Sequence, residues 1–438
     1  MLQGPRCPRE SSRFRSVIAV DRREAGSIVV VGAGPAGLLA ALALEAAGFQ
    51  PHLVGPAPMR ELGRTDTRTT ALFGASVTML DSLDVGHCLE ESGAAIRAIR
   101  IVDDTGRLVR APEVVFQAGE LGLEAFGYNI SNRALVAALE ARAARPGSAV
   151  TRLECAVSRI EPSEDRVAVH VEGHDRPLSA GLVVGADGRG SLCRRAAGID
   201  ARTWPYPQVA IACNFAHTRP HQHVSNEFHR CAGPFTTVPL PGLMSSLVWV
   251  EAPDEAERVL ALPDSELAEA IEARSQGLLG RVTSVGPRSS FPLSGLKVAR
   301  LGARRVALVG EAGHVVPPIG AQGLNLACRD VLALTEGLAD ALAAGRDPGA
   351  RETLHAYDRS RRRDIESRTF GVDALNRTLM SDLLPAQLAR GLGLGLLANL
   401  PFLRRLAMQE GLGPSLRPSW LRSPRVSTGS AVRDPTAT

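Results

Sequence analysis

The chain has 438 residues, which is enough for two or three domain-sized units with a large buried core. Hydrophobic residues make up 45% of the chain and charged residues 22%, proportions that are ordinary for a globular protein. The formal net charge is only +4, and no basic block is interleaved with aromatic residues, so binding to nucleic acid is not expected.

The first 26 residues contain several arginines but lack the apolar stretch of a secretory signal. Their arginine content and their lack of periodicity favour a disordered extension over residues 1–26. The seven cysteines are odd in number and dispersed, which is typical of a cytoplasmic protein.

A glycine-rich turn follows the first apolar run. Residues 28–31 are all β-branched, and Gly32, Gly34 and Gly37 then stand in a G-x-G-x-x-G spacing before an Ala- and Leu-rich run. In such a strand–turn–helix the first glycine permits the tight turn, the second lets backbone N–H groups approach a pyrophosphate, and the third lets the helix pack on the strand. This context favours a dinucleotide site over a glycine-rich turn without a ligand.

The second predicted strand, within residues 51–56, ends without the Asp or Glu that usually bonds a ribose hydroxyl. Glu61, a few residues later, is an alternative acid. The missing acid counts against a simple NAD-dependent dehydrogenase, and it leaves an adenine dinucleotide held mainly through its phosphates.

Two later segments repeat the order of strand, glycine and acid. Residues 182–191 form a β-run that ends in Gly-Ala-Asp-Gly around Asp187, and residues 305–325 form another that leads into Glu311. Three such units in this order resemble the FAD-dependent aromatic hydroxylases of the para-hydroxybenzoate hydroxylase type.

The resemblance implies a role for each segment. Glu311 stands where that family usually has Asp, and it would accept a hydrogen bond from the flavin ribityl chain. Pro317, Pro318 and His314 would lie near the flavin ring, and the segment around Asp187 would lie between the FAD pyrophosphate and the path of the nicotinamide donor. The cofactor-binding residues implied so far are Gly32, Gly34, Pro35, Ala36, Gly37, Asp187, Gly188, Gly310, Glu311, Pro318, Gly320, Gln322, Gly323, Leu324 and Asn325.

A finer resemblance rests on residues 66–72, 126–135 and 233–242. These segments look like the ubiquinone-biosynthesis hydroxylases of the UbiH/UbiF/UbiL group, particularly its alphaproteobacterial branch. The group has an arginine after the second strand that contacts the cofactor, which maps to Arg68. Asn132 stands where the group usually has Arg or Gln, so the implied cofactor set extends to Arg68 and Asn132.

The resemblance also implies the reaction. In the family, electrons from NAD(P)H or from a reductase protein reduce FAD. O2 then adds at flavin C4a, and the hydroperoxide hydroxylates an electron-rich ring. For this group the substrate is a polyprenylated phenol, and other ubiquinone-biosynthesis proteins are expected partners. Two alternatives stay open: a hydroxylase of a small soluble aromatic compound, and a non-catalytic flavin-binding scaffold.

No catalytic base follows from the spacing of the residues. Activation of a phenol needs a group whose pKa lies near the working pH. His217, His229, Tyr206 and Tyr128 all remain candidates.

The expected fold class is α/β, with a discontinuous Rossmann-like FAD-binding domain, an inserted antiparallel sheet that forms the substrate domain, and a helical C-terminal region. Helices are predicted around residues 70–80, 133–144, 264–279, 324–342 and 354–376. The predicted domain limits are 27–200 and 291–345 for the FAD-binding domain, 201–290 for the sheet, 346–416 for the helical region and 417–438 for a disordered tail.

No metal site is expected, because the cysteines show no C-x-x-C spacing and the segment His221-Gln222-His223 has no matching acid cluster. The uncharged run at 391–403 is too short to span a bilayer. It predicts either a buried helical hairpin or an interfacial element, flanked by Arg390, Arg404 and Arg405, that makes peripheral contact with the inner membrane.

Overall fold

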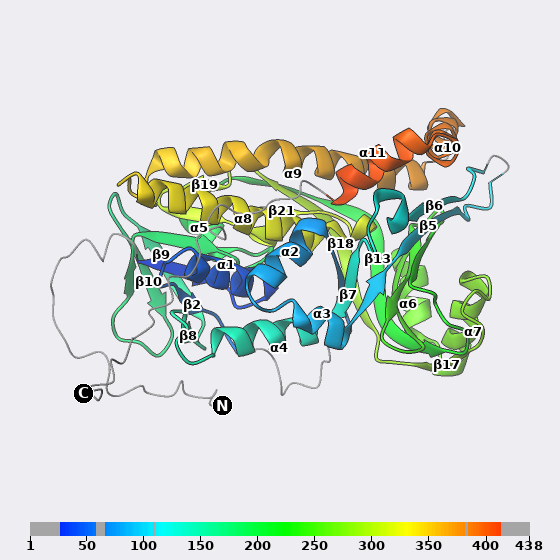
Figure 1. Cartoon of the computed structure of the whole chain (residues 1–438), viewed down its shortest axis with the longest axis horizontal. Helices are drawn as coiled ribbons and strands as arrows, with labels where there is room; N and C mark the ends of the chain where they lie inside the picture. The colour runs from blue at the N-terminus through cyan, green and yellow to red at the C-terminus, as the bar shows by residue number, and fades with distance from the viewer. Residues whose placement is uncertain (1–26, 58–65, 108–109, 382–383, 413–438) are drawn as a thin grey trace, which may run out of the picture.

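The computed structural model describes residues 27–57, 66–107, 110–381 and 384–412. The extension predicted at 1–26, the tail predicted at 417–438 and the alternative acid Glu61 lie outside these residues. The fold is α/β with a helical C-terminal region, as predicted (Figure 1).

The glycine-rich turn belongs to a six-stranded sheet with the order β19-β20-β12-β1-β2-β8. The five strands from β20 to β8 run parallel to one another, and the edge strand β19 pairs with β20 antiparallel. All four residues of β1 are buried, as expected for a parallel strand that is covered on both faces. The strands are β1 Ile28–Val31, β2 His52–Val54, β8 Thr151–Leu153, β12 Leu182–Gly185, β19 Gly302–Ala303 and β20 Val306–Leu308.

Helix α1 packs between its neighbours α4 and α8 in the core of this part of the molecule. Eight consecutive residues of α1, from Gly37 to Leu44, are buried. The predictions of helices near 133–144 and 324–342 are confirmed. The bounds are α1 Pro35–Ala46, α4 Asn132–Ala143, α5 Leu192–Ala196 and α8 Gln322–Ala343.

The helix predicted around 70–80 is wrong in its first part. Thr69–Phe73 form strand β3, which pairs antiparallel with β7, and helix α2 begins only at Gly74. Pairing with a strand some 60 residues away therefore overrides the local apolar pattern.

Two three-stranded sheets lie within the described residues. One contains β3 Thr69–Phe73, β7 Gly127–Ser131 and β4 Gly93–Ile96, and the other contains β9 Val157–Pro162, β10 Val167–Val171 and β11 Leu178–Ala180. Helices α2 Gly74–Ser82 and α3 His87–Ser92 lie next to the first of these.

The second large sheet has nine strands in the order β21-β18-β13-β16-β15-β14-β5-β6, with β17 paired to β13. It reaches beyond the predicted insert at 201–290, because the hairpin β5–β6 comes from residues 98–117 and β21 comes from the loop after β20. The strands are β5 Ala98–Asp103, β6 Val114–Gln117, β13 Ala201–His217, β14 Val224–His229, β15 Pro234–Leu240, β16 Met244–Glu251, β17 Val282–Val285, β18 Ser289–Val298 and β21 His314–Val315.

One face of this sheet packs on helices α6 Pro253–Ala261 and α7 Asp264–Arg274 through a core that includes Phe215, Phe235 and Trp249. Helix α7 ends at Arg274 rather than near 279. The left-handed conformations of Gln276 and Gly277 end the helix there.

The C-terminal helices lie along both halves of the molecule. Helix α9, Arg351–Met380, runs above α8 toward the nine-stranded sheet, and α10 Leu384–Asn399 and α11 Pro401–Leu412 lie at its far end (Figure 1). The predicted helix at 354–376 is thus confirmed and is longer at both ends. No helix in the described ranges is long and apolar enough to cross a membrane.

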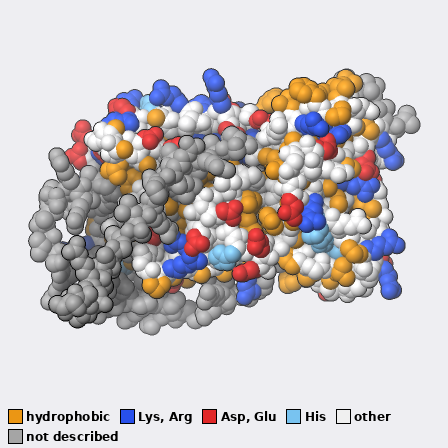
Figure 2. Space-filling view, viewed as in Figure 1, with side chains coloured by type: hydrophobic (Ala, Val, Ile, Leu, Met, Phe, Trp, Pro, Cys, Tyr) orange, Lys and Arg blue, Asp and Glu red, His pale blue; other side chains and the backbone are white. Residues whose placement is uncertain are grey.

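The hairpin predicted within 391–403 forms, but it is not buried. Apolar side chains gather on its outer surface, at the upper right of Figure 2. Met408 and Leu412 on the inner side of α11 pack on Phe73, Phe116 and Phe126.

Candidate functional site

The glycine-rich turn has the close contacts and the open space that a pyrophosphate needs. A Cβ added to Gly32 would lie 2.3 Å from the Ala186 carbonyl oxygen, and one added to Gly37 would lie 1.7 Å from the Gly32 oxygen. Gly34 has nothing within 4 Å of such an atom. Because Gly34 caps α1 without a side-chain hydrogen bond, the first N–H groups of the helix open onto this space. The turn therefore fits a phosphate group.

The predicted ribityl loop lies next to this turn. Gly310 adopts a φ of +60°, and a Cβ there would lie 3.4 Å from the Cβ of Ala36 at the start of α1. The exposed carboxylate of Glu311, in the 3-10 turn η2 Gly310–Ala312, accepts from the Nε of Arg189 at 3.1 Å. The acid thus lies at the open side of the loop, where its exposed oxygens could accept from a hydroxyl in addition to Arg189.

Asp187 is engaged within its own turn. Its carboxylate accepts from the hydroxyl of Ser191 at 2.6 Å and from the N–H of Cys193 at 3.0 Å, at the start of α5. Gly188, with a φ of +77°, has open space beside it. Asp187 therefore stabilises the turn, and the backbone of the neighbouring Gly188 is the part of the turn that can face a ligand.

The predicted flavin-ring loop is built around the 3-10 turn η3, Ile319–Ala321. Gly320 and Ala321 both have positive φ values, +64° and +50°, and the second is strained because Ala has a Cβ. Pro318, Gly320 and Gly323 are exposed, whereas Pro317 is buried. The exposed side of the loop is thus free of long side chains, and Leu324 is half-buried behind it.

Asn325 holds this loop against the neighbouring strand and helix. Its Oδ1 accepts from the Phe73 N–H at 3.0 Å and from the Ser76 hydroxyl at 2.7 Å. Its Nδ2 donates to the carbonyls of Ala71 and Ala321 at 2.8 and 2.7 Å. The side chain is 2% exposed, so Asn325 positions the loop rather than reaching a ligand.

Arg68 and Asn132 both bond the Asp66 carboxylate, and the two bonds help to lower the pKa of Asp66. Arg68 donates to both Asp66 oxygens at 2.8 Å and lies 5.1 Å from the centre of the Phe291 ring. The Asp66 carboxylate, and more weakly the charge of Glu311, raise the pKa of Arg68. Asn132 accepts from the Thr70 hydroxyl at 2.6 Å. The two predicted residues are thus brought together, and Arg68 is the one whose charge reaches the ribityl loop.

His314 is held behind the loops by residues that the sequence motifs did not indicate. Its Nε2 lies 2.6 Å from Asp330, whose Oδ2 also accepts from the Gly310 N–H at 3.0 Å. Arg361 donates to the other oxygen at 2.8 Å. Burial would raise the pKa of Asp330, but the charges of His314 and Arg361 outweigh it and lower that pKa. An acid within the apolar run of α8 was the available signal, because a buried carboxylate needs a partner.

The four candidate bases differ in their surroundings. Burial and the Asp373 carboxylate raise the pKa of Tyr206 to about 12, so its hydroxyl stays protonated at neutral pH. Burial lowers the pKa of His217, and its ring nitrogens bond the Arg219 carbonyl and the Ser245 hydroxyl. His229 bonds Glu227 through Nε2 at 2.9 Å, and its buried Nδ1 has no hydrogen-bond partner among the residues that the structure describes.

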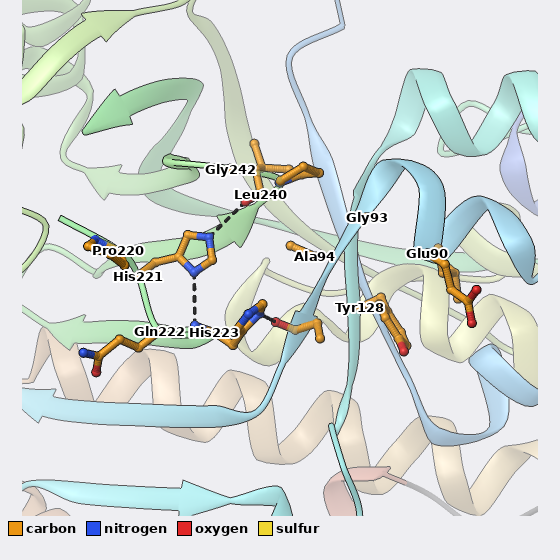
Figure 3. Close-up of a pocket in the computed structure, with 13 residues that line it drawn as sticks. Glu90, Gly93, Ala94, Tyr128, Pro220, His221, Gln222, His223, Leu240 and Gly242 are labelled. Atoms are coloured by element: carbon orange, nitrogen blue, oxygen red, sulfur yellow. Dashed lines mark hydrogen bonds between the residues drawn. The ribbon is translucent and has the colours of Figure 1, made fainter. Parts of the chain in front are cut away.

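Tyr128 lines a pocket of about 400 Å³ where β4 and β7 meet the turns of the nine-stranded sheet (Figure 3). The rings of His221 and His223 line it too, and they bond the carbonyls of Leu240 and Ala95 at 3.0 and 3.1 Å. The histidine pair thus fastens these turns together.

Over residues 209–216 of β13 and residues 244–250 of β16, the face of the nine-stranded sheet opposite α6 and α7 carries no charged side chain. Ser246 on this face bonds Thr69 in β3 at 2.9 Å and Asn129 in β7 at 3.1 Å. Alternation along the paired strands places Ala210, Ala212, Val248 and Val250 on the same face. At Ser246 this face therefore looks toward β3 and β7, whereas Ala210, Val248 and Val250 pack in one cluster with Tyr206, Leu293 and Met380.

Two arginines near the sheet, Arg230 and Arg258, could in principle bind an anionic substrate, but both are paired. Arg230 donates to Asp104 at 2.7 Å, and Arg258 on α6 bonds Glu255 at 2.7 Å. Neither offers an unpaired cation to this face.

A family model described as an FAD binding domain matches residues 26–369. Ubiquinone hydroxylase UbiL of Rhodospirillum rubrum is 35% identical over 388 residues, covering 88% of this chain and 89% of that protein. The 3-demethoxyubiquinol 3-hydroxylase of Escherichia coli is 30% identical, covering 88% of this chain and 98% of that protein. In fold, the chain resembles p-nitrophenol 4-monooxygenase PnpA from Pseudomonas putida DLL-E4, with a TM-score of 0.71, 19% identity and coverage of 89% and 98%.

Proposed function

Because the chain belongs to the family of FAD-dependent hydroxylases of ubiquinone biosynthesis, we propose that it hydroxylates the aromatic ring of a polyprenylated phenol. The protein is an FAD-dependent aromatic-ring monooxygenase that uses O2 and a reduced electron donor. The observation that carries the substrate class is the uncharged face that β13 and β16 turn toward β3 and β7.

The residues present fit FAD. The open N-terminus of α1 beside Gly34 would hold the pyrophosphate, and the exposed Glu311 would accept from a ribityl hydroxyl. The exposed backbone of Pro318, Gly320 and Gly323 would face the flavin ring. When bound, FAD supplies the activation of dioxygen, with electrons from NAD(P)H or from a reductase.

The sheet face argues for a neutral, apolar substrate. A small anionic compound would need an unpaired cation there, and Arg230 and Arg258 are each bound to an acid. Small apolar side chains such as Ala212 would instead contact a neutral ring and its tail. Each buried methylene of such a tail contributes about 0.8 kcal/mol.

Residues beside the flavin-ring loop help to exclude water. The Pro317 ring has no N–H to donate, Ile319 is buried, and the hydroxyl of Thr67 is bonded to the Ala212 carbonyl at 3.2 Å. These three residues therefore add no unpaired donor beside the loop, which suits chemistry that water would quench.

Purified, FAD-loaded protein tests the substrate class. Reduced protein is exposed to O2 with either a short-tailed prenylphenol or a tailless hydroxybenzoate, and the products are weighed by mass spectrometry. We expect one added oxygen on the prenylphenol alone. The variant Arg230→Gln should keep this preference, because its cation is already paired. Hydroxylation of the tailless acid alone would contradict the proposal, and quinone profiling of a deletion strain would identify the ring carbon.

Membrane contact through α10 and α11 is the second part of the proposal. These helices expose the side chains of Leu392, Leu396, Leu400, Phe402 and Leu406 (Figure 2). Arg405 is exposed among them, whereas Arg404 is paired with Glu120 at 2.8 Å. An apolar surface with a nearby cation suits a helix pair that lies on anionic lipid and collects a long-tailed substrate there.

A further inference from the structure

Three arginines converge on one carboxylate behind the candidate cofactor loops. Asp364 on α9 accepts from Arg329 at 3.0 Å, from Arg361 at 2.8 Å and from Arg368 at 2.8 Å. The side chains of these arginines are each less than a tenth exposed. Asp364 therefore fixes the directions in which they can extend.

Two of the three arginines are linked to the cofactor loops by hydrogen bonds through one intermediate side chain each. Arg361 bonds Asp330, which holds the Gly310 N–H and so reaches the ribityl loop. Arg368 donates through Nη1 to the Oε1 of Gln322 at 2.9 Å, and the Nε2 of Gln322 donates to the Gly320 carbonyl at 2.8 Å. The strained turn at Gly320 and Ala321 is thus held from behind by Arg368.

The remaining arm of Arg368 reaches the C-terminal hairpin. Its Nη2 donates to the Glu410 carbonyl in α11 at 2.6 Å. The same helix is docked by the buried Met408 and by Leu412, whose carbonyl oxygen would lie 2.8 Å from a Cβ on Gly74. One guanidinium therefore joins α9, α11 and the flavin-ring loop.

We propose that Arg368 is a positioning residue that couples the docking of α11 to the conformation of the flavin-ring loop. The inference rests on the proposed function, since it takes the 317–325 loop as the one that faces the flavin. A planar guanidinium can donate in three directions at once, whereas a lysine ammonium cannot copy that fork. When α11 is displaced, Gln322 loses its partner and the strained turn loses its support from behind.

Full-length protein with Arg368→Gln or Arg368→Lys tests this role. The readouts are the FAD dissociation constant and the visible circular dichroism of bound FAD, neither of which needs a substrate. We expect FAD binding to weaken roughly fivefold or more and the dichroism to change in both variants. The matched control is Arg377→Gln on the same helix, which breaks an exposed pair with Asp373 and should leave both readouts unchanged.

A second variant tests the coupling from the other end. Met408→Asp places a charge in the buried contact of α11 and should reproduce the dichroism change of Arg368→Gln. The double variant should then show little further change, because both substitutions break one connection. If Arg368→Gln only lowers the melting temperature while the dichroism and FAD affinity match the wild type, the inference is wrong. A wild-type protein that binds no FAD would instead overturn the proposed function.

Discussion

At the scale of single residues, a motif predicts a backbone turn better than it predicts what a side chain does. The sequence correctly indicated that Gly32, Gly34 and Gly37 form a turn with one open and two crowded positions. Asn325 stands in such a motif, but its side chain is used by Phe73 and Ser76, about 250 residues earlier. Partners that distant cannot be deduced from local spacing.

Glu311→Ala should weaken FAD binding, because the exposed carboxylate would no longer accept from a ribityl hydroxyl. Hydrogen bonds to a charged group are worth about 1.5–3 kcal/mol, so the dissociation constant should rise roughly tenfold or more. Fluorescence titration with FAD measures it. Glu311→Asp should retain most of the affinity, and Glu257→Ala on the exposed side of α6 should retain all of it. An unchanged constant in Glu311→Ala would show that the ribityl role belongs to another residue.

At the scale of elements, the sequence predicted long periodic helices well and the strand β3 poorly. Helices α8 and α9 carry a sustained apolar face, whereas Thr69–Phe73 became a strand because β7 pairs with it. The hairpin α10–α11 shows the same limit. Its helices follow from the apolar run, but only the docking of Met408 and Leu412 decides which side stays exposed.

The exposed side of α10 and α11 should bind anionic vesicles reversibly at low salt and less at high salt, since the apolar side chains insert while Arg405 attracts lipid head groups. Vesicle flotation measures the bound fraction. The double variant Phe402→Ser/Leu406→Ser should stay with the soluble fraction. Leu243→Ser, which removes another exposed apolar side chain, from the β15–β16 turn, should still float. A wild-type protein that never floats would exclude the membrane proposal.

At the scale of the whole molecule, the buried charges between α8 and α9 tie the cofactor side to the C-terminal helices. Burial would raise the pKa of Asp364, but Arg361, Arg329 and Arg368 lower it from the usual 3.8 of an aspartate to about 2. The ionised carboxylate therefore stabilises the fold fully above about pH 4, and this contribution is lost as the pH falls through 2.

Asp364→Asn should lower the free energy of unfolding at pH 7 by about 2 kcal/mol or more, because the depressed pKa alone corresponds to that amount and three arginines lose their charged partner. The difference from the wild type should shrink between pH 4 and pH 2. Urea unfolding at a series of pH values measures it. Asp84→Asn, at an exposed pair with Arg145, should cost little at any pH. A pH-independent difference would mean that the carboxylate charge contributes nothing.

The parallel pairing of β5 with β14 sets an order of events during synthesis. Ala98 in β5 is aligned with Val224 in β14, so β5 cannot pair until a strand 126 residues later has been synthesised. At about 5–20 residues per second, that delay is on the order of ten seconds at the ribosome. During it, the hairpin β5–β6 has an unpaired edge, which is the kind of surface that chaperones cover. The nine-stranded sheet therefore cannot form from residues 201–290 alone. Transplanting these residues into another protein would leave β14 without its neighbour β5.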